Sequence, residues 1–154
     1  MATTKNTAEF FPFKVKDGKT LFVLQRKYGL AGIGFFTQIM RWLSQSPGHY
    51  YQYVDEYDKD RLNQFCGVGE SDTKAMIEDM VKTEKLDPEL WRKYQVIYSQ
   101  DFVDELAELY RRRKAEPPTR EWVIEQVSCS DDIMPSICRH DDDNMSTSRG
   151  IPRT

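Results

Sequence analysis

The chain has 154 residues, of which 31% are charged and 39% hydrophobic, and its formal net charge is -3. This length suits one hydrophobic core and is short for two. No apolar run approaches the roughly 18 residues that a membrane-spanning helix needs, and the first residues lack the apolar core of a signal peptide. The three cysteines match no zinc-ligand spacing. We therefore expect one domain in the cytoplasm, with no metal site and no membrane anchor.

The small net charge hides a strong segregation along the chain. Residues 1–50 hold seven basic and two acidic groups, whereas residues 51–108 hold 15 acidic and seven basic groups. Residues 109–120 are basic again, and the remaining residues are acidic. A basic face is therefore compatible with this composition, although a uniformly basic protein is excluded.

The N-terminal third predicts an extended segment followed by two helices. Residues 1–9 are small and polar, and we expect them to be disordered. Residues 10–15 should be extended, because the residue before a proline avoids the α region. Apolar residues at helical spacing predict helices at 19–28 and 32–46. Gly29 stands where a helix C-cap favours positive φ, and the glycines that follow it predict a hinge between the two helices.

The middle of the chain predicts one strand and a pair of helices. Residues 50–54 are aromatic and β-branched, as in a short strand. A helix at 59–66 should take Asp58 as its N-cap, and the Gly-Val-Gly run that follows should end it. Ser71 should then cap a second helix at 72–85, whose apolar residues recur at helical spacing.

The last elements complete the pattern of a known fold. Residues 96–98 predict a second strand, and residues 101–114 predict an amphipathic helix. Helix, helix, strand, helix, turn, helix, strand, helix is the order of a winged helix-turn-helix. We therefore predict a mainly α fold with a small β wing over residues 10–115. Residues 116–154 should be a linker and a mostly disordered tail, with one or two helical turns at 120–127.

Several segments resemble the Lin1244/Lin1753-type N-terminal domain, and the resemblance covers residues 10–114. They are FFPFKVKDGKTLFVLQRKYGLAGIGFFTQIMRWL, the Tyr-rich strand, CGVGESDTKAMIEDMV and VIYSQDFVDELAELYRRRK. This domain of unknown function occurs in phage and prophage proteins related to DnaD-like replisome organisers. The resemblance implies a winged-helix fold, DNA binding or self-association at a replication origin, and assembly of a helicase-loading complex. Nothing after Pro118 predicts a second folded domain.

The predicted helix at 72–85 is the candidate recognition helix, because the second helix of a helix-turn-helix enters the major groove of DNA. The residues placed at this interface are Ser71, Lys74, Lys82 and Lys85. Glu78 shares their face, and the acidic residues of this helix would repel phosphate. The alternative is a solvated face on which Glu78 pairs with Lys82.

The densest basic run consists of Arg111, Arg112, Arg113 and Lys114. Cations at a helix C-terminus also favour the helix dipole, so the run has a structural explanation. Its functional interpretation is contact with DNA phosphates, which adds affinity without sequence information. Lys14 and Lys16 are further candidates for phosphate contact.

The sequence predicts no catalytic residues and no cofactor. His49 and His140 have no nucleophile near them in sequence, and the acidic run at 141–143 is typical of a solvated segment. The tyrosines of 50–57 could stack on bases, but the acidic residues among them favour a strand of the core. The glycines at 29–34 follow a helix rather than a strand, which argues against a phosphate loop.

We therefore expect a non-enzymatic protein that binds double-stranded DNA during phage or prophage replication initiation. Its expected partners are DNA, further copies of itself, and a replicative helicase or its loader. The alternative is an oligomerisation or adaptor module with little direct DNA binding, to which the apolar residues of 122–127 would contribute a docking helix. Convergence of the basic N-terminal half and the Arg111 run on one face would favour DNA binding. Their separation would favour the adaptor.

Overall fold

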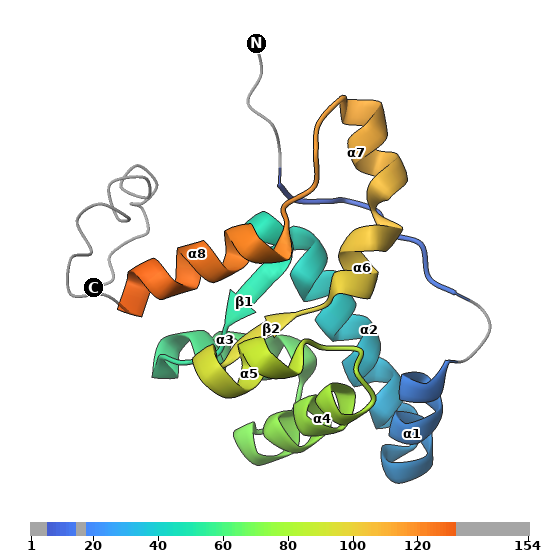
Figure 1. Ribbon diagram of the computed structural model, residues 1–154. Coiled ribbons are helices and arrows are strands. Elements are labelled where there is room, and N and C mark those ends of the chain that lie inside the picture. Colours follow the sequence, from blue (N-terminus) through green and yellow to red (C-terminus); the bar gives the residue numbers. More distant parts are fainter. Residues whose placement is uncertain (1–5, 15–17, 132–154) are drawn as a thin grey trace. The chain divides into compact units, whose positions relative to one another are not determined.

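The computed structural model describes residues 6–14 and 18–131, and it divides the chain into two units, 1–118 and 119–154. Figure 1 shows the elements. Those of the first unit are α1 (Lys19–Tyr28), α2 (Leu30–Gln45), η1 (Pro47–His49), β1 (Tyr50–Gln52), α3 (Glu56–Cys66), α4 (Glu70–Lys82), α5 (Pro88–Tyr94), β2 (Val96–Tyr98), α6 (Gln100–Glu105) and α7 (Ala107–Arg113). The described part of the second unit is α8 (Arg120–Asp131). The prediction of a mainly α fold with a small β element is confirmed.

The two strands form an antiparallel pair that brings the middle of the chain to its later part. Tyr51 lies opposite Ile97 at the centre of the register, and the Tyr53 N–H extends the pairing by donating to the Gln95 carbonyl at 2.9 Å. Tyr53 is fully buried, and its hydroxyl donates to Asn63 Oδ1 at 2.8 Å. Both strands were predicted, although β1 is two residues shorter than expected.

The turn between α1 and α2 is a single residue rather than the predicted glycine-rich hinge. Gly29 has a φ of 67°, as its predicted place at the end of α1 requires, and α2 begins directly at Leu30. Gly32 and Gly34 therefore lie inside α2. Gly32 is buried against α1, and a Cβ at this position would lie 2.3 Å from the Leu24 carbonyl oxygen. The absence of a side chain at Gly32 is what allows the two helices to approach closely.

The described residues before α1 are held against the end of α2, although residues 6–9 belong to a segment that was expected to be disordered. Ala8 is buried, its N–H donates to the Ser44 carbonyl at 2.7 Å, and the Ser44 hydroxyl donates to the Ala8 carbonyl at 2.6 Å. Phe11 then packs edge-on against Phe102 of α6, with ring centroids 5.5 Å apart. Residues 1–5 and 15–17 lie outside the described part of the chain. The described N-terminal residues are therefore part of the fold.

Two features of the second half of the first unit differ from the prediction. Helix α5 was missed, although Asp87 caps its N-terminus by accepting from the Leu90 N–H at 3.0 Å, and Pro88 is its first residue. The prediction of one continuous helix at 101–114 is wrong. This segment is divided into α6 and α7 at the buried Leu106, whose φ of -91° and ψ of 6° depart from helical values.

The described part of the second unit is helical over the predicted turns at 120–127, and the helix continues to Asp131, beyond the expected start of the disordered tail. Helix α8 has 12 residues, and the Thr119 hydroxyl caps it by accepting from the Trp122 N–H at 3.1 Å. A threonine in this position is a standard N-cap signal. The rest of the predicted tail, residues 132–154, lies outside the described part of the chain.

Replacing Gly32 with Ala should destabilise the protein, because the added methyl group meets the backbone of α1 rather than a movable side chain. Overpacking of this kind costs roughly 1–3 kcal/mol. Gly34→Ala is the matched control in the same helix, since nothing lies within 4 Å of its added Cβ. It should stabilise the protein by about 0.5–1 kcal/mol. Urea unfolding measures both changes, and equal effects of the two substitutions would contradict the close approach.

Candidate functional site

Helices α3 and α4 form the predicted helix pair around a tight glycine turn. Gly67 ends α3 in the left-handed region with a φ of 75°, and its N–H donates to the Asn63 carbonyl at 2.8 Å. Gly69 is the N-cap residue of α4, which begins at Glu70. Two cap predictions are therefore wrong, because Ser71 lies inside α4 and α3 begins after Asp55 rather than after Asp58.

One face of α4 is buried as predicted, but it also includes an aspartate. Met76, Ile77, Met80 and Val81 are in the core. Asp79 is 6% exposed and faces α1, where it accepts hydrogen bonds from Lys27 Nζ at 2.9 Å and from the Tyr28 hydroxyl at 2.6 Å. Asp79 is one of the acidic residues of this helix that were expected to repel phosphate. Its carboxylate instead joins α4 to α1.

The Asp79 contacts shift the proton affinity of two groups. Burial raises the pKa of the Asp79 carboxyl, but the hydrogen bonds from Tyr28 and Lys27 outweigh it, and the pKa lies below its ordinary value. Burial, together with the hydrogen bond to Asp79, raises the pKa of Tyr28 to about 12. Asp79 is therefore ionised and Tyr28 is protonated at neutral pH.

The outer face of α4 carries Lys74 and Lys82, as predicted, together with acidic groups. Lys74 pairs with Glu70 one turn earlier, at 3.5 Å. Glu78 accepts a hydrogen bond from the Trp91 indole N–H of α5 at 2.8 Å, which differs from its predicted pairing with Lys82. Within residues 6–14 and 18–131, Lys82 forms no ion pair, and its side chain is exposed. Lys82 is therefore the cation of this face that is most available to a partner.

Lys85 does not lie on the face of α4, contrary to the prediction. The helix ends at Lys82, and Glu84 has a φ of 67°, which turns the chain away from the helix axis. The Lys85 ammonium lies over the Phe36 ring of α2, 5.7 Å from its centroid. Lys85 therefore belongs to a different surface from Lys74 and Lys82.

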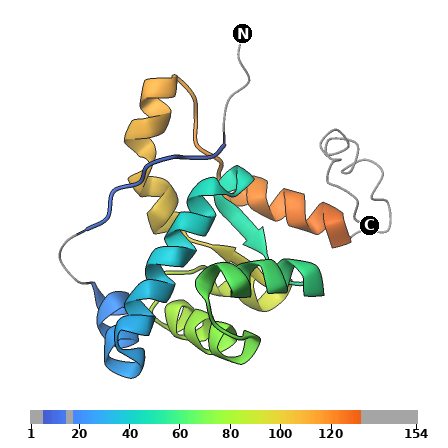
Figure 2. The same ribbon diagram turned by 180° about the vertical axis from the view of Figure 1, so that it is seen from behind.

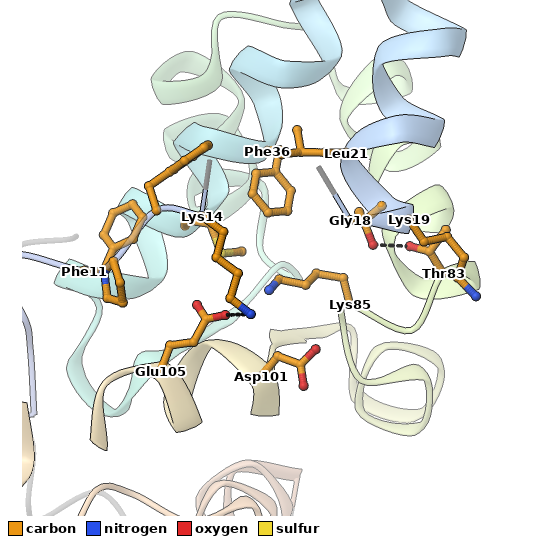
Figure 3. Close-up of a pocket in the computed structure, with 14 residues that line it drawn as sticks. Phe11, Lys14, Gly18, Lys19, Leu21, Phe36, Thr83, Lys85, Asp101 and Glu105 are labelled. Carbon is orange, nitrogen blue, oxygen red and sulfur yellow. Dashed lines mark hydrogen bonds and ion pairs between the residues drawn. The ribbon is translucent and has the colours of Figure 1, made fainter. Parts of the chain in front are cut away.

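The surface that Lys85 joins is a pocket of about 280 Å³, which Figure 3 shows in close-up. Its apolar lining comes from the segment before α1 and from α1 and α2, namely Phe11, Pro12, Phe13, Leu21, Phe36 and Met40. Its charged lining consists of Lys14, Lys19, Lys85, Asp101 and Glu105. Lys14 and Glu105 pair across it at 3.1 Å. The two signs of charge balance closely, so the pocket has no strong preference for an anion.

Lys14 was predicted to contact phosphate, and its pairing with Glu105 argues for a structural role instead. Lys16, the other candidate in this segment, lies outside the described residues. On the opposite side of the pocket, the hydroxyls of Thr20 and Thr83 are 2.7 Å apart and connect α1 to the end of α4. The pocket walls are therefore held by contacts between segments that are far apart in the sequence, since one pair joins the segment before α1 to α6 and the other joins α1 to the end of α4.

The predicted basic run lies at the end of α7, where it is largely engaged in local contacts. Arg111 and Arg112 both pair with Glu108 of the same helix. Arg113 lies over the Tyr110 ring at 5.3 Å, and Lys114 is the left-handed residue that ends the helix. The interaction with the helix dipole and the pairing with Glu108 therefore explain part of the positive charge at this helix end.

The basic residues of α1 and α4 do not converge with the Arg111 run. Figures 1 and 2 show α7 at one end of the first unit and α1 and α4 at the other. The Arg111 run and the lysines of α4 are therefore separate surfaces.

Buried His49 holds the base of α7, because its imidazole bonds the Leu43 carbonyl at 2.9 Å and the Tyr110 hydroxyl at 2.6 Å. Burial lowers the pKa of His49.

The described residues offer no obvious centre for metal chemistry. No group of three or more His, Cys, Asp or Glu side chains in the described part of the chain is arranged to hold a metal ion. None of its helices is both long enough and apolar enough to cross a membrane.

These features define a small, mainly helical domain with a two-stranded antiparallel sheet and a helix pair around a glycine turn. Residues 10–102 match the model of the family described as Lin1244/Lin1753-like, N-terminal. The chain belongs to this family. No curated protein and no solved structure matches it.

Replacing Asp79 with Asn should destabilise the protein by about 2 kcal/mol at neutral pH, because hydrogen bonds to a charged group contribute roughly 1.5–3 kcal/mol. The folded pKa of Asp79 lies below its ordinary value, so its stabilisation is present above pH 4 or so and disappears as the pH falls through the folded pKa. The difference between wild type and variant should shrink over this acidic range. Thermal unfolding against pH measures it, with the exposed Asp72→Asn as the control. A difference that is constant with pH would contradict this role.

Proposed function

We propose that this chain is a non-enzymatic DNA-binding protein that acts in the initiation of phage or prophage DNA replication. In this proposal, α2, β1, α3, α4 and β2 form a winged-helix unit of the kind found in DnaD-like replisome organisers. The observation that carries the proposal is the α3–α4 pair, which packs around the Gly67–Gly69 turn and leaves one face of α4 outside the core. This is the arrangement by which a helix-turn-helix presents its second helix to DNA.

The interface on α4 is smaller than the sequence predicted. Ser71 and Lys74 lie in its first two turns, the part of a recognition helix that meets base edges, and Lys82 lies near its end, where it would contact phosphate. The inward orientation of Asp79 supports this assignment, because it removes one negative charge from the face. Lys85 and the Arg111 run lie elsewhere and are not part of this interface.

The remaining parts of the proposal follow from family resemblance. The protein would act in the cytoplasm on double-stranded DNA, as one component of an assembly that includes a replicative helicase or its loader. It would supply binding and positioning, and no catalytic group.

Replacing both Lys74 and Lys82 with Glu should abolish duplex DNA binding without unfolding the protein, because both side chains are exposed. Fluorescence anisotropy of a labelled duplex at several salt concentrations measures the affinity. The double variant Arg26→Glu and Arg92→Glu, which changes exposed residues of α1 and α5, makes the same charge change away from α4. Binding that survives the α4 variant, or fails equally in both variants, would sink the α4 assignment.

The separation of the Arg111 run from α1 and α4 favours a second candidate, an adaptor that associates with copies of itself. Phe22 of α1 and Leu30 at the start of α2 are large apolar side chains that are 59% and 81% exposed. Large exposed apolar patches mark protein–protein contact surfaces, and this candidate assigns both side chains to one such surface. In this candidate the pairings of Arg111, Arg112 and Lys14 with carboxylates are structural.

If the adaptor function holds, sedimentation equilibrium should give a mass above the 18.1 kDa of one chain. Replacing Phe22 and Leu30 with Ser should return the mass to that of a monomer. Val54→Ser, at a residue that is 49% exposed and lies after β1, is the control. A wild-type protein that is monomeric at high concentration would remove the self-association candidate.

A further inference from the structure

Two arginines lie over aromatic rings where α2 packs against α3. The Arg61 guanidinium lies 5.3 Å from the centroid of the Trp42 ring, and the Arg41 guanidinium lies 5.1 Å from that of Phe65. The Trp42 and Phe65 rings are in contact, with centroids 4.7 Å apart. The two guanidiniums therefore cover neighbouring parts of one aromatic surface. Figure 2 shows α2 and α3 side by side.

These arginines keep their charge available to a partner. Both are exposed, and neither forms an ion pair with a carboxylate within the parts of the chain that the structure describes. Arg41 donates instead to the neutral Gln38 amide oxygen at 2.6 Å. Arg111 and Arg112 differ in this respect, because both are paired with Glu108.

A position over a ring prepares a guanidinium for binding an anion. A guanidinium over a ring keeps N–H donors that point away from the ring, and these can form hydrogen bonds to a partner. A guanidinium held in this way loses little rotamer freedom when its fork binds two oxygens of a phosphate. Helix α3 also carries Glu56, Asp58 and Asp60. The attraction must therefore come from the two guanidiniums themselves, through their charge and their oriented N–H donors, because the surrounding helix adds no net positive charge.

We infer that Arg41 and Arg61 bind the phosphodiester backbone of nucleic acid. This surface on α2 and α3 is distinct from the outer face of α4 and from the run on α7. The inference rests on the proposed contact with DNA, but it does not depend on α4 as the recognition helix. Trp42, Tyr57 and Phe65 are positioning residues here, since they hold the two guanidiniums in place.

The test measures binding of a labelled DNA duplex and of a labelled single strand to the full chain by anisotropy at several salt concentrations. Arg41→Ala with Arg61→Ala should weaken duplex binding by about tenfold or more at low salt. It should also reduce the slope of log affinity against log salt by about 1.8, since each phosphate contact contributes about 0.9. Arg26→Ala with Arg92→Ala removes the same charge from α1 and α5 and should have a much smaller effect.

Lysine variants separate charge from orientation. Arg41→Lys with Arg61→Lys should keep the salt slope but bind several-fold more weakly, because an ammonium lacks the planar fork. Circular dichroism of each variant checks that the fold is kept. Weaker binding of duplex and single strand alike supports a backbone site that is indifferent to strandedness, and an effect on one form assigns the site to that form.

The outcomes distinguish this inference from the α4 proposal. If the alanine pair behaves like the Arg26 and Arg92 control while the Lys74 and Lys82 variant loses binding, the arginine site is overturned and α4 stands. If the alanine pair loses binding while the Lys74 and Lys82 variant keeps it, the arginine site stands without α4. A wild-type chain that binds neither form of DNA at low salt overturns both.

Discussion

The close crossing of α1 and α2 at Gly32 is the constraint on which the rest of the first unit depends. A side chain there would meet the Leu24 carbonyl, so only glycine lets the two helices approach closely. The close approach of the two helices fixes which residues of α4 the ends of α1 can contact. Lys27 and Tyr28 at its end bond Asp79, and Thr20 at its beginning bonds Thr83, so α1 fixes the inner face and the end of α4 together. The orientation of the candidate recognition helix is thus determined partly by a glycine on another helix.

The same contacts decide which charges are available to a partner. Asp79 is turned inward by α1, and Glu78 is held by Trp91 of α5, which leaves Lys82 as the most available cation on the outer face of α4. Pairing with Glu70, Glu105 and Glu108 engages Lys74, Lys14 and the first arginines of α7. Several basic side chains of this chain are therefore paired with its own carboxylates. The pair Arg41 and Arg61 stands out because its contacts are with rings and a neutral amide.

Both candidate functions therefore involve small surfaces rather than one broad basic face. DNA binding would use one helix face and a pair of arginines that lie over aromatic rings, and the adaptor would use exposed apolar side chains of α1 and the start of α2. Phosphate contacts add affinity that falls steeply with salt, whereas apolar contacts do not. Salt dependence is thus the physical property that separates the two, and it can be measured without knowing the target sequence.

The sequence by itself determined the mainly α class, both strands, the ends of α1 and the buried face of α4, because hydrophobic periodicity and glycine punctuation are local signals. It also contained unused local signals, since Asp87-Pro88 begins α5 and Tyr57 precedes Arg61 by one helical turn. Only the tertiary structure decided that Asp79 faces inward, that Lys85 joins Phe36, and that α7 lies at the opposite end of the first unit from α1 and α4. Those outcomes depend on which helices pack together, and partners that lie 51 or 52 residues apart, as those of Asp79 do, leave no periodic trace in the chain.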